Sequence, residues 1–242
     1  MKKIFENELQ NLNFINSGSF GNVYKCNFDD KDFAFKKFKD LSYLKGKIRK
    51  LNFLSQINDN DLILPNYFII DDKNNIIGYL TKYFYSHDIS DETLNKTLEE
   101  KIIILKNLKE SILKMKKENI IHTDLIPGNI LLSNDACKII DFDNCSFNGS
   151  KININQVNDF TYDFIKYYGL SNNVDTFLFN LITFSVINEI EFYLVREKVY
   201  LKEFKYFTDN KDAIKICDSF FLNSKYANED FLIDTIDNSK II

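Results

Sequence analysis

The chain has 242 residues, of which 45% are hydrophobic and 27% are charged, a composition that is typical of a folded globular protein and excludes wholesale disorder. Its net charge is −4 and charges of both signs are interspersed, so we expect no binding to nucleic acid or to a membrane surface. The length is enough to bury a substantial core in one large domain or in two lobes.

Segments that would direct the chain to a membrane or out of the cell are not predicted. The N-terminal residues have no apolar stretch of signal-peptide length, and the most apolar segment, residues 174–192, is interrupted by polar residues such as Asp175 and Asn180. The four cysteines have no C-x-x-C spacing, and only His87 and His122 could join them at a metal. We therefore expect a cytoplasmic protein with buried thiols, a buried helix at 174–192 and no zinc site.

The first third of the chain has the pattern of a small sheet with one helix. Residues 12–38 predict three consecutive strands, and residues 62–70 and 76–84 predict two more, separated by turn-forming residues. Between them, residues 41–57 carry leucine and isoleucine at helical spacing. This part is therefore expected to form a five-stranded sheet with one helix.

A glycine-containing loop joins the first two predicted strands. Glycine lets the backbone approach phosphate groups closely and point its N–H groups at them. Two glycines three residues apart are weak support alone, because hairpin loops use glycine routinely. The candidate phosphate-binding residues are Ser17, Gly18, Ser19, Phe20 and Gly21.

The third predicted strand contains two neighbouring lysines, Lys36 and Lys37. Side chains alternate between the two faces of a strand, so Lys36 shares a face with Ala34 whereas Lys37 points the other way. If Ala34 lines a nucleotide pocket, Lys36 reaches the phosphates and Lys37 is a solvated surface charge. The alternative is that Lys36 is an ordinary exposed strand lysine.

Three polar residues lie in two short loops that follow a helix predicted at 91–117, with Ser90 as its N-cap. Asp124 can accept a proton, and Asn129 and Asp141 carry the hard oxygen atoms that Mg²⁺ prefers. Each residue alone could be a turn-forming Asp or Asn. Together, after a glycine loop and a strand lysine, they favour phosphoryl transfer.

The order of these features resembles the protein-kinase signature of glycine-rich loop, strand lysine, catalytic loop with Asp and Asn, and Asp-Phe-Gly magnesium site. The chain is identified as a divergent, bacterial-type member of the eukaryotic-like Ser/Thr kinase superfamily. The resemblance covers about residues 12–188 and implies an α+β, two-lobed kinase-like fold. The N-lobe is expected at 1–84 and a mainly helical C-lobe at 85–242.

The resemblance also implies the roles of individual residues, with ATP and Mg²⁺ as cofactors and a protein as substrate. Asp124 would be the catalytic base, Lys36 would bind the ATP phosphates, and Asn129 and Asp141 would hold Mg²⁺. The glycine loop would cover the phosphates. Further nucleotide-binding residues implied by the resemblance are Val23 and Ala34 over the adenine, and the backbone from Lys82 to Phe84 at its edge.

Supporting positions follow from the same resemblance. His122 is expected to be a packed, structural ring near the magnesium site. Asp175 is expected to support the backbone of the catalytic loop, or else to be an ordinary acidic residue in the first turn of a helix. Asn16 stands at the first glycine of the family pattern, so the loop should be stiffer at its entrance.

The largest departure from the family pattern is a missing glutamate. In the family, the N-lobe helix carries a glutamate that pairs with the strand lysine. Here no acidic residue lies between Asp40 and Asp59, and Lys47 or Lys50 stands where the glutamate is expected. Lys36 therefore has another partner, is held by the phosphates alone, or supports only weak activity.

Three further departures lie in the catalytic and magnesium loops. Thr123 replaces the arginine that contacts a phosphorylated activation loop, so control of that kind is not expected. Ile126 replaces the lysine that Ser/Thr kinases keep two residues after the base. Asp143 replaces the glycine of Asp-Phe-Gly and is either an auxiliary metal ligand or a cap for the following turn.

Three functions therefore compete. The leading one is an ATP- and Mg²⁺-dependent protein Ser/Thr kinase. Ile126 and Asp143 favour the alternative of a kinase for a small-molecule hydroxyl, and the missing helix glutamate favours a pseudokinase that binds nucleotide or a partner without turnover. The pattern does not predict the oligomeric state.

Overall fold

The structure is a computed structural model that describes residues 1–133, 136–201, 210–221 and 230–236. The chain divides into two compact units. Unit 1 holds Met1–Tyr85 together with Ile140–Asp143, and unit 2 holds Ser86–Ile139 and Asn144–Ile242. The expected division after residue 84 did not foresee that the short segment Ile140–Asp143, which carries the predicted magnesium ligand Asp141, belongs to unit 1.

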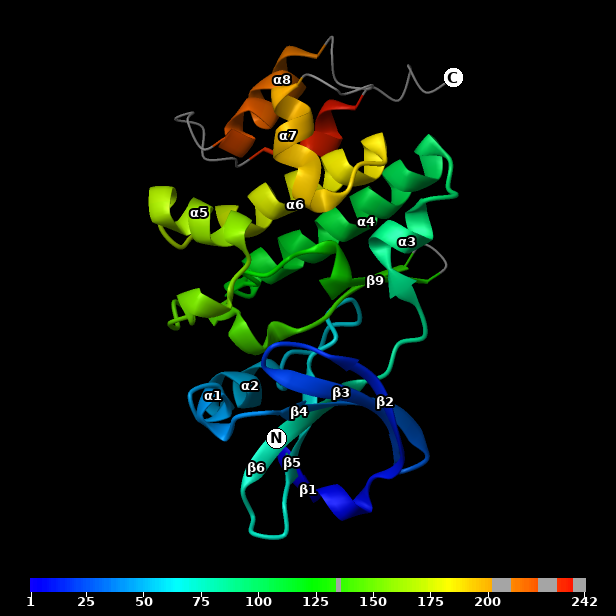
Figure 1. The fold of residues 1–242 in the computed structure, drawn as a ribbon, viewed down its shortest axis with the longest axis vertical. Coiled ribbons are helices and arrows are strands. Elements are labelled where there is room, and N and C mark those ends of the chain that lie inside the picture. The colour runs from blue at the N-terminus through cyan, green and yellow to red at the C-terminus, as the bar shows by residue number, and fades with distance from the viewer. Residues whose placement is uncertain (134–135, 202–209, 222–229, 237–242) are drawn as a thin grey trace. The chain divides into compact units, whose positions relative to one another are not determined.

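Unit 1 is built on a six-stranded sheet (Figure 1). In sheet order its strands are β1 (Lys2–Phe5), β5 (Pro65–Ile70), β6 (Ile76–Lys82), β4 (Lys31–Phe38), β3 (Gly21–Phe28) and β2 (Gln10–Ser17). All neighbours are antiparallel except β1 and β5. The five predicted strands are present, and β1 adds a sixth that the sequence pattern did not predict because it is only four residues long.

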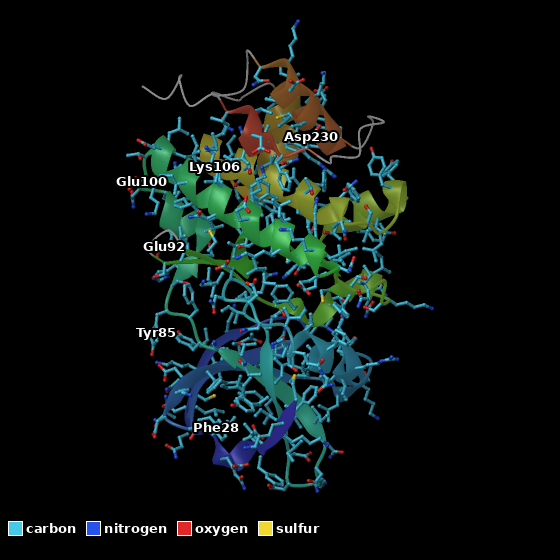
Figure 2. The ribbon with its side chains drawn as sticks, turned by 180° about the vertical axis from the view of Figure 1, so that it is seen from behind. Phe28, Tyr85, Glu92, Glu100, Lys106 and Asp230 are labelled. Atoms are coloured by element: carbon cyan, nitrogen blue, oxygen red, sulfur yellow. The ribbon has the colours of Figure 1, made fainter. Side chains whose placement is uncertain are left out.

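The hairpin between β3 and β4 fixes the register of the strand that carries Lys36. Asp29 and Asp30 both have positive φ, 51° and 55°, as the two central residues of a type I′ turn require. Below this turn one face of β4 buries Phe33 and Phe35 in the main core of unit 1. Phe28, labelled in Figure 2, adds its ring to this core, with its centroid 6.4 Å from that of Phe33.

The single helix predicted at 41–57 is wrong: two short helices, α1 (Leu41–Lys45) and α2 (Ile48–Leu54), take its place. Gly46 is the C-cap of α1, and glycine weakens a helix interior by about 1 kcal/mol relative to alanine. Both helices still bury their leucines, because Leu44 and Leu51 form a second core cluster with residues of the sheet.

Near the start of unit 2, a second predicted helix is divided into two in the structure. The predicted helix at 91–117 is instead α3 (Ile89–Thr93) followed by α4 (Leu98–Lys117), and the predicted cap Ser90 lies inside α3. Asp88 caps α3, and Thr97 caps α4 through a capping box with Glu100. The T-x-x-E pattern of this box was visible in the sequence and is a start signal that our prediction overlooked.

The remaining elements of unit 2 are short strands and further helices. The strands are β7 (His87–Asp88), β8 (Ile120–Ile121), β9 (Ile130–Ser133), β10 (Ala136–Ile139) and β11 (Ser146–Phe147), and the helices are α5 (Asp159–Tyr168), α6 (Asn173–Asn188), α7 (Val195–Tyr200) and α8 (Lys211–Asp218). Helix α6 is buried on all sides from Val174 to Ile187 and packs against α4 (Figure 1). It is therefore the central helix of unit 2, as expected.

Within the described residues, no single helix combines the length and the apolar character needed to cross a membrane. The helices Asn173–Asn188 and Phe192–Tyr200 pass that test only when taken as a pair, and the pair is bent by 106°. All four cysteines are buried, as predicted, and none forms a disulfide.

Candidate active site

The loop between β2 and β3 is closed by its own backbone. Gly18 N donates to Gly21 O at 2.9 Å, and Lys39 Nζ donates to Gly18 O at 2.7 Å. A Cβ on Gly21 would lie 2.7 Å from the carbonyl oxygen of Lys37, so this glycine is required by the close approach of β4. Asn16 tightens the entrance of the loop, because its side chain accepts a hydrogen bond from Ser17 N at 2.7 Å.

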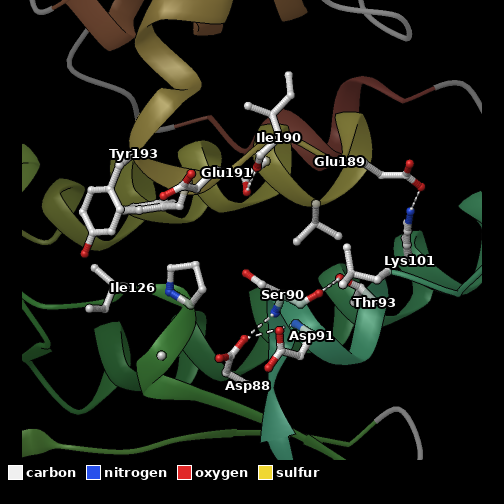
Figure 3. A pocket seen from close by; sticks show the side chains of 16 residues that line it. Asp88, Ser90, Asp91, Thr93, Lys101, Ile126, Glu189, Ile190, Glu191 and Tyr193 are labelled. Carbon is white, nitrogen blue, oxygen red and sulfur yellow. Dashed lines mark hydrogen bonds and ion pairs between the residues drawn. The ribbon is translucent and has the colours of Figure 1, made fainter.

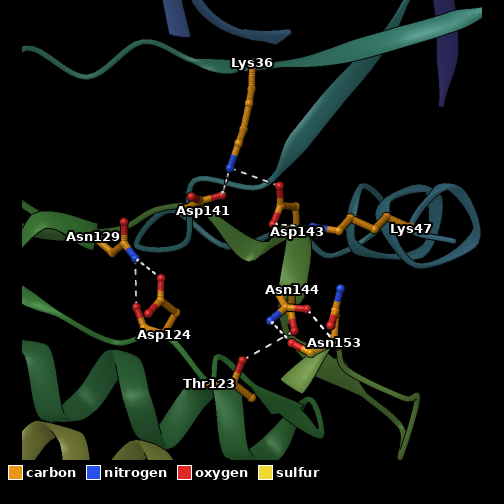
Figure 4. A network of polar contacts seen from close by, with 9 residues as sticks. All are labelled: Lys36, Lys47, Thr123, Asp124, Asn129, Asp141, Asp143, Asn144 and Asn153. Carbon is orange, nitrogen blue, oxygen red and sulfur yellow. Dashed lines mark hydrogen bonds and ion pairs between the residues drawn. The ribbon is translucent and has the colours of Figure 1, made fainter. Parts of the chain in front are cut away.

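Lys36 and Asp141 are brought together within unit 1 (Figure 4). Lys36 Nζ lies 2.5 Å from Asp141 Oδ1, and Asp143 Oδ2 lies 3.0 Å from the same nitrogen. Burial alone would lower the pKa of Lys36, but the charges of Asp141 and Asp143 outweigh it and raise that pKa well above its usual value. Lys36 is therefore fully charged at neutral pH.

The two strand lysines point to opposite faces, as the alternation predicts. Lys37 Nζ lies 2.6 Å from Glu6 Oε1, on the far side of the sheet from Asp141. Both side chains of this pair are about one-third exposed, at 39% and 31%. Lys37 is thus a surface charge with one partner, rather than a purely solvated one.

The same sheet holds the residues predicted to contact adenine, or ends just before them: Val23, Ala34, Lys82 and Phe84. Val23 pairs with Lys36 across β3 and β4, and Ala34 pairs with Thr81 across β4 and β6. Lys82 ends β6 with an exposed side chain, and Phe84 follows it half-buried. Their roles toward the adenine stay predictions.

Asp124 lies in unit 2, in the loop between β8 and β9, where side-chain amides hold both of its carboxylate oxygens (Figure 4). Asn129 Nδ2 donates to Asp124 Oδ2 at 3.1 Å and to its backbone oxygen at 2.8 Å. Asn158 Nδ2 donates to Asp124 Oδ1 at 2.9 Å. These contacts to both carboxylate oxygens orient Asp124.

Asn158 was missed by the sequence analysis. It is the N-cap of α5, and its side-chain oxygen accepts a hydrogen bond from Thr161 N at 3.0 Å while its nitrogen holds Asp124. An Asn directly before an apolar helical run is a recognisable cap signal, so the helix start could have been predicted. Its contact with Asp124, 34 residues away, could not.

The backbone beside Asp124 is strained and is held by a buried carboxylate. Thr123 has φ +66°, which is an outlier for a β-branched residue. Asp175 accepts hydrogen bonds from Thr123 N at 3.1 Å and from His122 N at 2.8 Å. Burial raises the pKa of Asp175, against the opposing effects of His122 and these N–H groups. The prediction that Asp175 supports this loop is confirmed, and the buried His122 ring accepts a hydrogen bond from Asp124 N at 3.3 Å.

The chain after the magnesium loop folds back on itself through side-chain amides. Asn144 Nδ2 donates to Asn153 O at 3.2 Å, and Asn153 N donates to Asn144 Oδ1 at 3.0 Å (Figure 4). Inside this loop Ser146 Oγ donates to Ser150 O at 2.8 Å, and Phe147 N donates to Ser150 Oγ at 2.9 Å. These hydrogen bonds hold residues 144–153 together.

A pocket of about 560 Å³ lies in unit 2 beside the loop that carries Asp124 (Figure 3). Ile126 and Pro127 of that loop form one wall, and residues at α3 and after α6 form the others. Its lining has four carboxylates and one lysine, which is ion-paired with Glu189 at 2.5 Å; these residues are Asp88, Asp91, Glu189, Glu191 and Lys101. The pocket is therefore acidic.

Oxygen atoms suited to Mg²⁺ are present in each unit. Asn129 directs its amide nitrogen at Asp124, which turns its amide oxygen the other way, and the side chain of Asp141 is 34% exposed. In the part of the chain that the structure describes, no group of three or more His, Cys, Asp or Glu side chains could hold a metal. Each of these oxygen atoms, taken within its own unit, is of the hard type that Mg²⁺ prefers.

Comparison with known families decides the assignment. The model of the protein kinase domain matches residues 9–225, which is most of the chain. The chain belongs to the protein kinase domain family. Its α+β architecture, with a mixed sheet in unit 1 and a mainly helical unit 2, is the kinase fold, so the predicted fold class is confirmed.

Individual relatives are kinases from distant organisms. A protein of Acanthamoeba polyphaga mimivirus that carries the provisional name of a serine/threonine-protein kinase is 32% identical over 61% of this chain and 27% of its own length. Cyclin-dependent kinase G1 of Arabidopsis thaliana is 29% identical over 60% of this chain and 26% of its own length. Myosin light chain kinase family member 4 of Homo sapiens is 32% identical over 53% and 35%. This kinase domain thus spans about a third or less of these relatives.

Proposed function

We propose that this kinase domain transfers the γ-phosphate of ATP to a serine or threonine hydroxyl of a protein, with Mg²⁺ as cofactor. The observation that carries the proposal is the oriented carboxylate of Asp124, which receives one amide N–H on each oxygen, from Asn129 and Asn158. A general base needs a fixed position, and these two amide contacts supply it.

In the proposed reaction, Asp124 orients the acceptor hydroxyl and takes its proton. Asn129 has two tasks, because its nitrogen fixes Asp124 and its oxygen is a ligand for Mg²⁺. Asp175 keeps the loop in its strained conformation, since its two hydrogen bonds to His122 N and Thr123 N are buried. Removing any of these residues disturbs the position of the base.

Unit 1 supplies the groups for the nucleotide. Lys36 would bind the phosphates and Asp141 would hold Mg²⁺; the two side chains form an ion pair at 2.5 Å. When bound, Mg²⁺ neutralises charge on the ATP phosphates. The glycine loop residues Ser17 to Gly21 would cover those phosphates, with the N–H groups of Ser17 and Gly18 bonded to Asn16 Oδ1 and Gly21 O in the structure.

The protein substrate is supported by the names of the relatives, two of which are a cyclin-dependent and a myosin light chain kinase. The acidic pocket beside Ile126 and Pro127 offers a surface for residues that flank the acceptor hydroxyl. One observation favours a small-molecule hydroxyl instead: Ile126 places an apolar side chain where Ser/Thr kinases keep a lysine. The expectation of a bacterial-type member stays a prediction.

Incubation with γ-labelled ATP and Mg²⁺ tests the proposal. Label is expected on a mixture of generic protein substrates with wild-type protein and with Asp72→Asn, an exposed turn residue, and is expected to vanish with Asp124→Asn and Asp141→Asn. Transfer to small alcohols alone would move the assignment to a small-molecule kinase. Nucleotide binding without any transfer would contradict both enzyme functions and leave the pseudokinase.

A further inference from the structure

Lys36 has a carboxylate partner even though the helix glutamate is missing. At the helices of unit 1, where the family has a glutamate, this chain has a residue of the opposite charge. That residue is Lys47, the N-cap of α2. The side chain of Lys47 is only 8% exposed. A buried lysine without an anion would be strongly destabilising, so its surroundings should contain one.

The anion is Asp143. Its Oδ1 accepts a hydrogen bond from Lys47 Nζ at 3.0 Å, and its Oδ2 lies 3.0 Å from Lys36 Nζ (Figure 4). Asp143 is thus a bridge between a strand lysine and a helix lysine.

Both carboxylate oxygens of Asp143 are directed at lysines, and its side chain is 7% exposed. Neither of the two roles considered from the sequence, auxiliary metal ligand or turn cap, matches this geometry. The group is also balanced in charge, because Lys36 and Lys47 face Asp141 and Asp143.

Aromatic rings complete the enclosure of Lys47. Its Nζ lies 5.6 Å from the ring centre of Phe38 and 5.8 Å from that of Phe20, which belongs to the glycine loop. Rings at this distance attract a cation. Lys47 therefore touches the strand that carries Lys36, the glycine loop and the segment that carries Asp141.

We propose that Asp143 and Lys47 together replace the missing helix glutamate: Asp143 positions Lys36, and Lys47 holds Asp143 in place. The charges of the usual strand–helix pair are thereby transposed, with the carboxylate on the magnesium loop and the cation on the helix. Both are positioning residues, and their effect on ATP rests on the proposed function of Lys36.

The test compares four variants of the full chain. Lys47→Glu and Asp143→Gly each break the bridge, and the double variant Lys47→Glu/Asp143→Gly rebuilds the strand lysine–helix glutamate pair of the family. Lys45→Glu is the matched control, because it makes the same charge change on an exposed lysine of α1. Thermal melting without nucleotide and the affinity for ATP with Mg²⁺ are measured for each.

Each single variant is expected to melt about 6 to 15 °C lower than wild type, since one partner of a buried pair is left uncompensated. Each is also expected to bind ATP on the order of tenfold more weakly, the effect of losing one orienting interaction. The double variant should recover about half or more of both losses, and Lys45→Glu should lose neither. Where transfer is measurable, the KM for ATP should rise while the KM for the protein substrate stays unchanged.

Losses that simply add in the double variant, or a Lys47→Glu variant that behaves like Lys45→Glu, would overturn the proposal. If a single variant does not fold, the milder pair Lys47→Met and Asp143→Asn gives the same double-variant comparison. Failure of the proposed function looks different, because ATP transfer would then be absent from wild type while the melting temperatures still showed the coupling.

Discussion

Lys36 in unit 1 is oriented by two carboxylates, whereas Asp124 in unit 2 is oriented by two neutral amides. The two arrangements differ in the free energy that is lost when one contact is removed. A hydrogen bond to a charged group contributes about 1.5 to 3 kcal/mol, and breaking a buried ion pair costs about 3 to 5 kcal/mol. Unit 1 therefore depends on every member of its charged group, while unit 2 can lose one amide and still fold.

The two regions also differ in how far they depart from the family pattern. The loop with Asp124 and Asn129 keeps its base and its amide at the expected spacing. The lysine site keeps Lys36 but has exchanged the charges around it, at Lys47 and Asp143. Both regions thus keep the residues that the family pattern leads us to expect, and only in unit 1 have the charged residues around them changed.

The largest effect is expected from Asp124→Asn, which keeps the size of the side chain and one of its two acceptor oxygens but removes the proposed base. We expect kcat to fall by about 10² to 10⁴, with the melting temperature within a few degrees of wild type, because positioned bases contribute that much to proton transfer. Steady-state kinetics and thermal melting of the same preparation measure it. An equally large loss of melting temperature would mean that Asp124 is mainly structural.

Gly78→Ala would disturb the position of Lys36 by a clash with the Lys36 backbone. A Cβ at Gly78 would lie 2.1 Å from Lys36 O and 2.7 Å from the ring of Phe35, so β6 and β4 would have to separate. We expect a loss of about 3 kcal/mol in the free energy of unfolding, measured by denaturant titration. Gly46→Ala is the control, since nothing lies within 4 Å of its Cβ. Equal stability of the two variants would contradict the close packing of β4 and β6.

Asn158→Ala removes one of the two amides from Asp124. We expect kcat to fall about tenfold and the free energy of unfolding to fall by about 1 kcal/mol, because Asn158 also caps α5. Asn158→Asp separates these two roles: the cap is kept, but a second negative charge lies beside Asp124. If Asn158→Asp is as active as wild type, the contact at 2.9 Å does not orient the base.

The smallest effect is expected from Lys37→Ala. Its exposed ion pair with Glu6 contributes about 0.2 to 1 kcal/mol to stability, and the side chain points away from Asp141. ATP affinity, measured by titration calorimetry, should be unchanged, in contrast to Lys36→Ala, which should weaken turnover. The reverse result would mean that the register of β4 is wrong by one residue.

Local periodicity was enough to predict the positions that depend on it. The alternation of side chains along a strand separated Lys36 from Lys37, and loop spacing singled out Asp124 and Asn129. Breaks in the two long helices were missed because apolar spacing continues across them, although Gly46 marked one of them.

Contacts between distant parts of the chain could not be predicted. Lys47 and Asp143 are 96 residues apart, and each alone conflicts with the family pattern: a lysine where an acid belongs, and an acid where glycine belongs. Only the fold shows that the two departures compensate each other. A family pattern that judges each position separately records Lys47 and Asp143 as two mismatches, although the two residues form a pair.

The bridge at Asp143 also bears on inhibition. Phe142 lies between Asp141 and Asp143 in the sequence and is buried, with 2% of its surface exposed. A compound that binds by displacing the Phe142 ring must also move the neighbouring Asp143. That movement would break the contacts of Asp143 with both Lys36 and Lys47. Compounds of that kind should therefore bind weakly to this domain.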